Sequence, residues 1–294
     1  MARALGKNSE ADRWLEDAAA IQTAILDKLY APDDAAFYDL DAQNHFVRVR
    51  SDVISRVLGE YVVDQKLFDA IYEREIHNPK AFGVPYPLPS IALDDPAFVR
   101  PIPRNSWGGA SQALTALRAP RWMEHYGKAA DLAHLMQQWV GAILRQSKFL
   151  QQIDPLDGTY TADSGDYSPA ALVSLDFTWR LCGVRRVGNS LEWNVRPEGH
   201  DSRSSYRLQI TPTRTAAIKY VSGRAELCLN DKPLYQTSSV VRLVTDLDGK
   251  LESATGIAPE TIAVLVRQAS GQERKFSIRP NESKYLSAST SESG

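Results

Sequence analysis

The sequence predicts a multidomain α+β protein, with a helical domain over residues 1–183 and a C-terminal antiparallel β-sandwich over residues 184–286. Two observations support this division. Apolar residues recur at three- and four-residue spacing before residue 183, whereas apolar and polar residues alternate after residue 184. The tail at 287–294, SASTSESG, is polar, and we expect it to be disordered.

The first predicted helix covers Glu10–Tyr30, where Trp14, Leu15 and Ile21 fall on one apolar stripe. Pro32 ends it, because proline has no N–H to donate. The segments FYDL and FVRV then predict a small hairpin around Asp41–Asn44.

Five more helices are expected, and six helices pair into about three hairpins. Ser51 and Asp64 are capping residues that begin the second and third helices. Six prolines in 81–104 predict an irregular loop. The remaining helices are expected at 111–126, at 128–146 after the terminator Gly127, and at 170–181 between Ser168-Pro169 and Gly183.

Short alternating segments separated by Gly, Asn, Asp and Pro follow residue 184, and this spacing is typical of a β-sandwich. The expected strands are LEWNV, YRLQI, TAAIKYV, AELCLN, VVRLVTD, TIAVLVRQ and KFSIRP.

Composition excludes several functions. Lys and Arg total 34 against 36 Asp and Glu, so a net charge of −2 offers no attraction to nucleic acid or anionic lipid. The two cysteines, Cys182 and Cys228, fall in different predicted domains, and the five histidines do not cluster. We therefore expect no disulfide framework and no metal site.

Neither a secretion signal nor an apolar run of membrane-spanning length occurs in the sequence. We expect a soluble chain with no membrane partner. Its compartment stays open, because a truncated N-terminus could have carried a signal.

Four segments resemble, in the same order, parts of one enzyme group. They are AILDKLYAPDDAAFYDLD, YPLPSIALDDPAF, NSWGGASQALTALRAPRWMEHYGK and FLQQIDPLDGTYTADSGDYSPAALVSLDF. Together they resemble the second half of the six-hairpin (α/α toroid) glycoside hydrolases, which include trehalase, the processing α-glucosidase of N-glycan maturation and mannosylglycerate hydrolase.

The resemblance implies about three hairpins of an α/α toroid and hydrolysis of an O-glycosidic bond in a small glycoside or oligosaccharide. It also implies that the reaction needs no organic cofactor and no metal. Such enzymes need a carboxylic acid that protonates the leaving oxygen and a carboxylate that activates water. The family's acid lies upstream of these segments, and its base aligns with Gln151, whose amide is no proton acceptor at useful pH. Asp154, Asp163 or Asp166 could serve instead.

Two other functions stay open. The chain could be a non-catalytic carbohydrate-binding remnant, which Gln151 favours, or another toroid enzyme such as a lyase or epimerase with Tyr or His as base. Half a toroid would leave apolar helix faces uncovered, which implies a missing N-terminal half or a partner chain.

The resemblance also places substrate-binding residues on the loops. Trp107 could stack on a sugar ring or anchor its loop. The polar side chains of Arg104, Asn105 and Gln112 could donate to sugar hydroxyls or be merely solvated. The rings of Tyr38 and Tyr86 could line the cleft or belong to the core. We expect Gln151, Asp154, Trp107 and Asn105 to converge on one end of the helical array.

Overall fold

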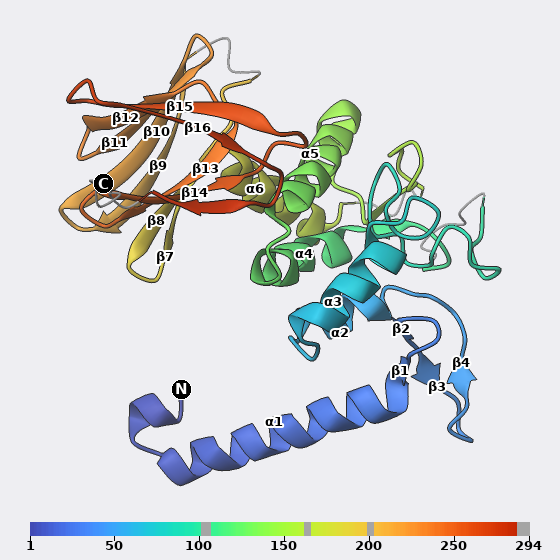
Figure 1. The fold of residues 1–294 in the computed structure, drawn as a ribbon. Coiled ribbons are helices and arrows are strands. Elements are labelled where there is room, and N and C mark those ends of the chain that lie inside the picture. Colours follow the sequence, from blue (N-terminus) through green and yellow to red (C-terminus); the bar gives the residue numbers. More distant parts are fainter. Residues whose placement is uncertain (101–106, 162–165, 199–202, 287–294) are drawn as a thin grey trace, which may run out of the picture. The chain divides into compact units, whose positions relative to one another are not determined.

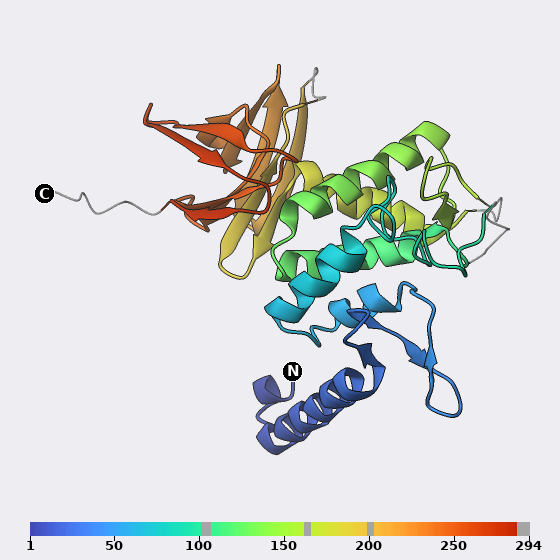
Figure 2. The ribbon, with the colours of Figure 1, turned by 45° about the vertical axis from the view of Figure 1, so that its right-hand side comes forward.

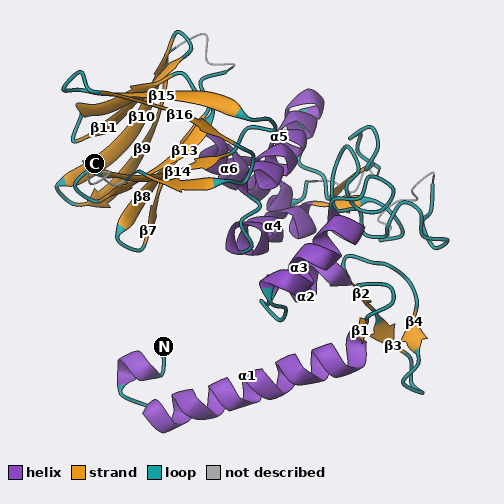
Figure 3. Ribbon diagram, viewed as in Figure 1, coloured by secondary structure: helices purple, strands orange, loops and turns teal. Residues whose placement is uncertain are grey.

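The computed structural model describes residues 1–100, 107–161, 166–198 and 203–286. The fold is α+β, as the sequence predicts. Helices predominate in the chain up to Cys182, and strands follow from Val184 (Figures 1 and 3). The described helices include none that is both long and apolar enough to cross a membrane.

The chain forms two compact units. Unit 1 comprises Met1–Trp122 and Leu150–Tyr167, and unit 2 comprises Met123–Phe149 and Ser168–Gly294. The sequence places a domain boundary at 183/184, where helix changes to strand, and that division stays a prediction.

Unit 1 holds most of the helices and six two-residue strands. In chain order, its helical elements are a 3-10 turn (Arg3–Leu5), α1 (Asn8–Leu29), α2 (Val53–Gly59), α3 (Gln65–Ile71) followed by a π-helical turn (Tyr72–Ile76), and α4 (Ala113–His125). The last turn of α4 belongs to unit 2. The strands form the antiparallel pairs β1 (Tyr30–Ala31) with β2 (Ala36–Phe37), β3 (Asp39–Leu40) with β4 (Phe46–Val47), and β5 (Ser111–Gln112) with β6 (Gln152–Ile153).

Local signals explain where these elements begin and end. Asp64 caps α3 by accepting a hydrogen bond from Leu67 N at 2.8 Å, as predicted. Gly127 ends α4 with a φ of 72°, a conformation that favours glycine. At α2, Asp52 occupies the N-cap position without a side-chain hydrogen bond to the helix backbone. The predicted capping residue, Ser51, lies one position earlier, and its Oγ accepts from Val53 N at 3.4 Å.

Helix α1 forms as predicted, but its apolar stripe is exposed. Only Ala11 is buried within it, and the exposed fractions of Trp14, Leu15 and Ile21 are 56%, 57% and 61%. A hydrogen bond of 2.7 Å from Gln22 Nε2 to the carbonyl of Val62 connects α1 to the turn before α3.

Unit 2 combines α5 (Ala129–Gln146) and α6 (Ser168–Cys182) with two antiparallel sheets. The six-stranded sheet has the order β16-β15-β12-β11-β10-β9 and the five-stranded sheet the order β17-β14-β13-β8-β7. Their strands are β7 (Val184–Val187), β8 (Ser190–Val195), β9 (Ser204–Thr211), β10 (Arg214–Val221), β11 (Arg224–Leu229), β12 (Lys232–Thr237), β13 (Val241–Asp246), β14 (Leu251–Gly256), β15 (Ile262–Gln268), β16 (Glu273–Ile278) and β17 (Ser283–Tyr285).

One hydrophobic core lies between the two sheets. Trp193 of β8 and Leu243 of β13 contribute from the smaller sheet, and Ile218 of β10 and Val264 of β15 from the larger. Alternate residues of each strand point inward, which is why the sequence alternates there. Helices α5 and α6 lie at one end of the sheets (Figure 2).

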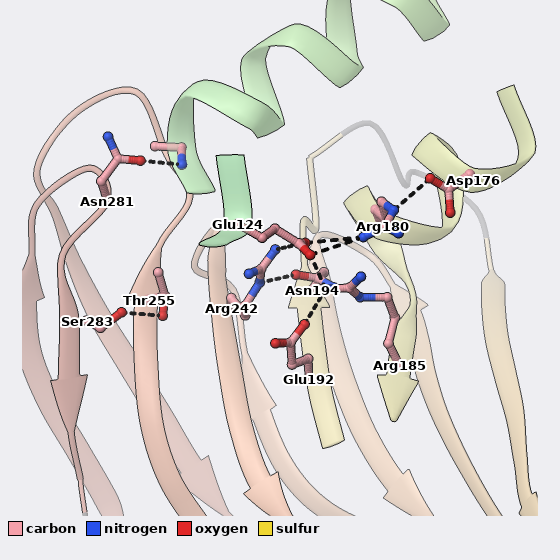
Figure 4. A network of polar contacts seen from close by, with 11 residues as sticks. Glu124, Asp176, Arg180, Arg185, Glu192, Asn194, Arg242, Thr255, Asn281 and Ser283 are labelled. Atoms are coloured by element: carbon pink, nitrogen blue, oxygen red, sulfur yellow. Dashed lines mark hydrogen bonds and ion pairs between the residues drawn. The ribbon is translucent and has the colours of Figure 1, made fainter. Parts of the chain in front are cut away.

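A polar network connects the helices of unit 2 to the five-stranded sheet (Figure 4). The Glu124 carboxylate accepts from Arg185 at 2.8 Å, and from Arg180 and Arg242 at 3.3 Å. Arg242 also donates to Asn194 at 2.7 Å. These residues come from α4, α6, β7, β8 and β13, so one carboxylate connects helices and strands that are remote in sequence.

Candidate functional site

The candidate site of unit 1 begins where β5 pairs with β6. Gln112 lies opposite Gln152 in this pair, and Ala113 N donates to Gln151 O at 3.0 Å. Strand β5 directly follows the Trp107 loop, and β6 directly follows Gln151. The pair thus joins two of the segments that carry the family resemblance.

Three glutamine side chains form a hydrogen-bonded chain across this pair. Gln151 Nε2 donates to Gln112 Oε1 at 3.4 Å, Gln112 Nε2 donates to Gln152 Oε1 at 3.1 Å, and Gln152 donates to Thr161. Gln112 and Gln152 are buried, whereas Gln151 is half-buried. The chain is electrically neutral, so it can orient hydroxyl groups but accepts no proton from water at useful pH.

Asp154 organises the turn after β6. Its carboxylate accepts from Leu156 N at 2.8 Å and from Arg100 Nε at 3.3 Å, while its backbone N–H donates to Thr159 O. Arg100 also lies 3.8 Å from Asp157. Hydrogen bonds from Thr159, with a smaller contribution from Arg100, hold the pKa of Asp157 below its usual value. Asp154 is 8% exposed, and its oxygens are engaged in holding the loop.

Tyr86 packs against the same turn. Its N–H donates to Pro155 O at 2.9 Å, and its carbonyl accepts from Ser111 Oγ at 2.7 Å. Gly158 adopts a φ of 72°, and a Cβ at this position would lie 2.3 Å from Tyr86 Cζ. The tyrosine ring therefore covers the glycine and is itself buried.

Trp107 lies beside a polar cavity between α2 and α4. Its ring is 40% exposed, and Arg56 Cζ lies 5.6 Å from the ring centroid. Asp52 fixes Arg56 through bonds of 3.1 and 2.8 Å and accepts from Thr115 Oγ1 at 3.0 Å. Arg56, Thr115 and Arg118 line the cavity, which has a volume of about 390 Å³. Sequence reasoning missed Asp52 and Arg56, although their four-residue spacing on a helix was a usable signal.

Tyr38 belongs to a separate cluster at the β3–β4 hairpin. Burial and a hydrogen bond with Asp34 raise its pKa to about 12. The Arg48 guanidinium lies 5.6 Å from the ring centroid and forms an ion pair with Asp34. The side chain is 5% exposed, so the phenol is a core group in this structure.

Four further candidate residues contribute nothing to the described part of this site. Asp166 is exposed. Arg104, Asn105 and Asp163 lie outside the described residues, so the predicted convergence of Asn105 with Gln151 stays a prediction. Across the described ranges, no group of three His, Cys, Asp or Glu residues is arranged to hold a metal ion.

Comparison with known families identifies the chain. Residues 1–179 match the family model of the mannosylglycerate hydrolase MGH1-like glycoside hydrolase domain. This match spans more than half of the chain, which therefore belongs to that family. The predicted relationship to six-hairpin glycosidases is confirmed. No curated protein matches the sequence.

Solved structures similar to this chain include larger enzymes. A protein described as a sialidase has a TM-score of 0.64 at 15% identity over 83% of this chain and 25% of its own. A mannosylglycerate hydrolase from Thermus thermophilus, in complex with glucose, has a TM-score of 0.44 at 21% identity over 52% of this chain and 37% of its own. The neutral trehalase Nth1 of Saccharomyces cerevisiae has a TM-score of 0.48 at 16% identity over 57% and 30%. The chain spans between 25% and 37% of these structures.

Proposed function

We propose that the chain contributes part of the active site of an enzyme that hydrolyses an O-glycosidic bond in a small glycoside or oligosaccharide. The observation that carries this proposal is the β5–β6 pair, which joins the loops of Trp107 and Gln151. An exposed indole ring and a chain of amides suit a sugar, whose faces are apolar and whose edge carries hydroxyl groups.

The described residues of this site lack an evident catalytic base. Gln151 occupies the position that the resemblance assigns to the base, and its amide belongs to a neutral chain. Asp154, the nearest alternative in sequence, already accepts from Arg100 and a backbone N–H. Hydrolysis needs one carboxyl group to protonate the leaving oxygen and another to take a proton from water. We infer that at least one of them comes from outside this chain.

We further propose that the helices form about three hairpins of an α/α toroid and that the two sheets of unit 2 are an accessory β-sandwich. The exposed stripe of Trp14, Leu15 and Ile21 supports a missing helical partner for α1, because contiguous apolar surface of this kind marks an interface. The partner would be the other half of the toroid, on the same polypeptide or on a second chain.

An assay of the 294-residue chain tests this proposal. Trehalose, mannosylglycerate and a panel of disaccharides are offered, and both sugar release and binding are measured. We expect binding without release, since loss of a general acid or base costs about 10²–10⁴-fold in rate and loss of both removes the mechanism. Trp107→Ala should weaken binding, whereas Trp14→Ala, which changes another exposed tryptophan, should leave it unchanged.

Reconstitution separates the two leading functions. Gln151→Glu should raise turnover only when the upstream half of a toroid relative is added in cis or in trans. Robust release by the purified chain alone, abolished by Asp154→Asn or Asp166→Asn, would show that the base lies within this chain. If neither the original chain nor Gln151→Glu releases sugar after the upstream half is added, and both still bind sugar, the result would favour the non-catalytic carbohydrate-binding function that the amide at Gln151 suggests.

A further inference from the structure

A cavity of about 470 Å³ in unit 2 is not part of the site described above. Its wall combines the exposed side of α5, the segment after β8, and the connections between β12 and β13 and between β14 and β15. The side chains that line it include Gln137, Arg196, Glu198, Ser238, Val240 and Glu260.

Arg196 is the unusual member of this wall. The residue is 8% exposed, and its Nε and Nη2 atoms are buried without a hydrogen-bond partner among the described residues. Its Nη1 lies 3.9 Å from Glu198 Oε2, a distance at which little directional bonding remains. Burial lowers the pKa of this guanidinium, because a charged group is poorly solvated there.

An unpaired buried donor is costly, and folded proteins normally satisfy such groups. Since Arg196 lines the cavity, a ligand with acceptor oxygens can satisfy the guanidinium once its terminal torsions turn toward the opening. A guanidinium offers five N–H donors in a planar fork, which suits adjacent oxygens.

The rest of the wall indicates what kind of ligand fits. Glu198 and Glu260 accept hydrogen bonds only, whereas the exposed amide of Gln137 and the hydroxyl of Ser238 both donate and accept. Buried Val240 adds an apolar patch. The lining thus carries two carboxylates and one guanidinium, a balance of charge that disfavours an anion. A neutral polyol is favoured, because each hydroxyl can accept from Arg196 and donate to a glutamate.

We propose that this cavity binds a neutral sugar, at a second carbohydrate site formed wholly by unit 2. Its volume falls within the range of about 300–1,000 Å³ that is usual for small-molecule pockets. The inference does not rest on the proposed hydrolysis, because every residue that carries it lies outside unit 1.

Calorimetric titration of the full chain with maltose, in a Trp107→Ala background, tests the proposal. The background weakens any binding by the unit 1 loops, so the signal reports on unit 2. Hydrogen exchange with and without maltose provides a site-resolved readout. We expect slower exchange in peptides that cover 237–240 and 258–263.

Variants of the cavity wall provide the decisive comparison. Gln137→Ala should weaken maltose binding by about 3- to 10-fold, as expected for a neutral hydrogen bond. Arg196→Met should weaken it by about tenfold or more, because its bonds are charge-assisted. Gln138→Ala changes the next residue of α5, which does not line the cavity, and should have no effect.

Two results would overturn the proposal. One is a maltose affinity that neither Gln137→Ala nor Arg196→Met reduces. The other is tight binding of glucuronate with no binding of maltose, which would make the cavity an anion site. If Arg196→Met fails to fold, the comparison of Gln137→Ala with Gln138→Ala still tests the proposal. Neither side chain is buried, so both variants should fold.

Discussion

Replacing Glu124 by glutamine should destabilise unit 2 strongly. The Glu124 carboxylate accepts from Arg180, Arg185 and Arg242 (Figure 4), and all four side chains are between 9% and 24% exposed. Glutamine keeps the shape but loses the charge and one acceptor oxygen. Arg180 and Arg185 would keep their ion pairs with Asp176 and Glu192, whereas Arg242 would face a neutral amide.

The size of the effect follows from burial. Breaking a fully buried ion pair costs about 3–5 kcal/mol. Because Glu124 is 24% exposed and glutamine retains one acceptor, we expect Glu124→Gln to lower the free energy of unfolding by about 2–3 kcal/mol. For a cooperative unit of this size each kcal/mol lowers the melting temperature by about 2–4 °C, so scanning calorimetry should show a fall of about 5–10 °C.

Glu60→Gln is the matched control. Glu60 also pairs with an arginine, Arg121, with both oxygens at 3.1 Å, but these side chains are 65% and 51% exposed. Solvent screens such a pair, and its loss should cost about 0–0.5 kcal/mol. A melting temperature for Glu124→Gln within about 1–2 °C of that for Glu60→Gln would refute the reasoning from burial.

Three further predictions concern single groups. Gly158→Ala should cost about 1–3 kcal/mol, because the new methyl group would overlap the facing tyrosine ring; Gly223→Ala, with a φ of 73° and open space around it, should cost less in urea denaturation. Burial raises the pKa of Tyr38 to about 12, so its contribution to stability is complete below about pH 10, the value of an exposed tyrosine, and is lost toward pH 12; Tyr38→Phe should flatten this part of the pH–stability curve. Burial raises the pKa of Cys182 to about 11 and that of Cys228 to about 12, so neither thiol should react with iodoacetamide at about pH 8 until urea unfolds the chain, and rapid labelling of the folded protein would contradict this.

Much of the helical part was predictable because its signals are local. The Asp64 cap, the terminator Gly127 and the hairpin around Asp41–Asn44 depend on residues within one or two turns of each other. The partners of the Asp52 carboxylate were not predictable in this way, because Thr115, which donates to it, is 63 positions away.

The candidate site divides in the same way. Trp107, Gln112 and Gln151 were predicted as site residues from the motifs, and the β5–β6 pair joins their loops, while their role stays a prediction. The two tyrosines were ambiguous in sequence, because an aromatic ring suits a cleft and a core equally well. In the structure, Tyr38 and Tyr86 are 5% and 9% exposed, a result of the neighbours that their loops meet.

The sequence by itself determined the change from helices to strands near residue 183, the absence of a strong net charge, and the amide at Gln151, because periodicity, composition and residue identity are properties of the chain. Tertiary structure alone decided which polar groups find partners. Glu124 gathers three arginines from elements far apart in the chain, while buried Arg196 keeps two donors unpaired within the described ranges. Hydrogen bonds form only within about 3.5 Å, and such proximity between distant residues exists only once the chain has folded.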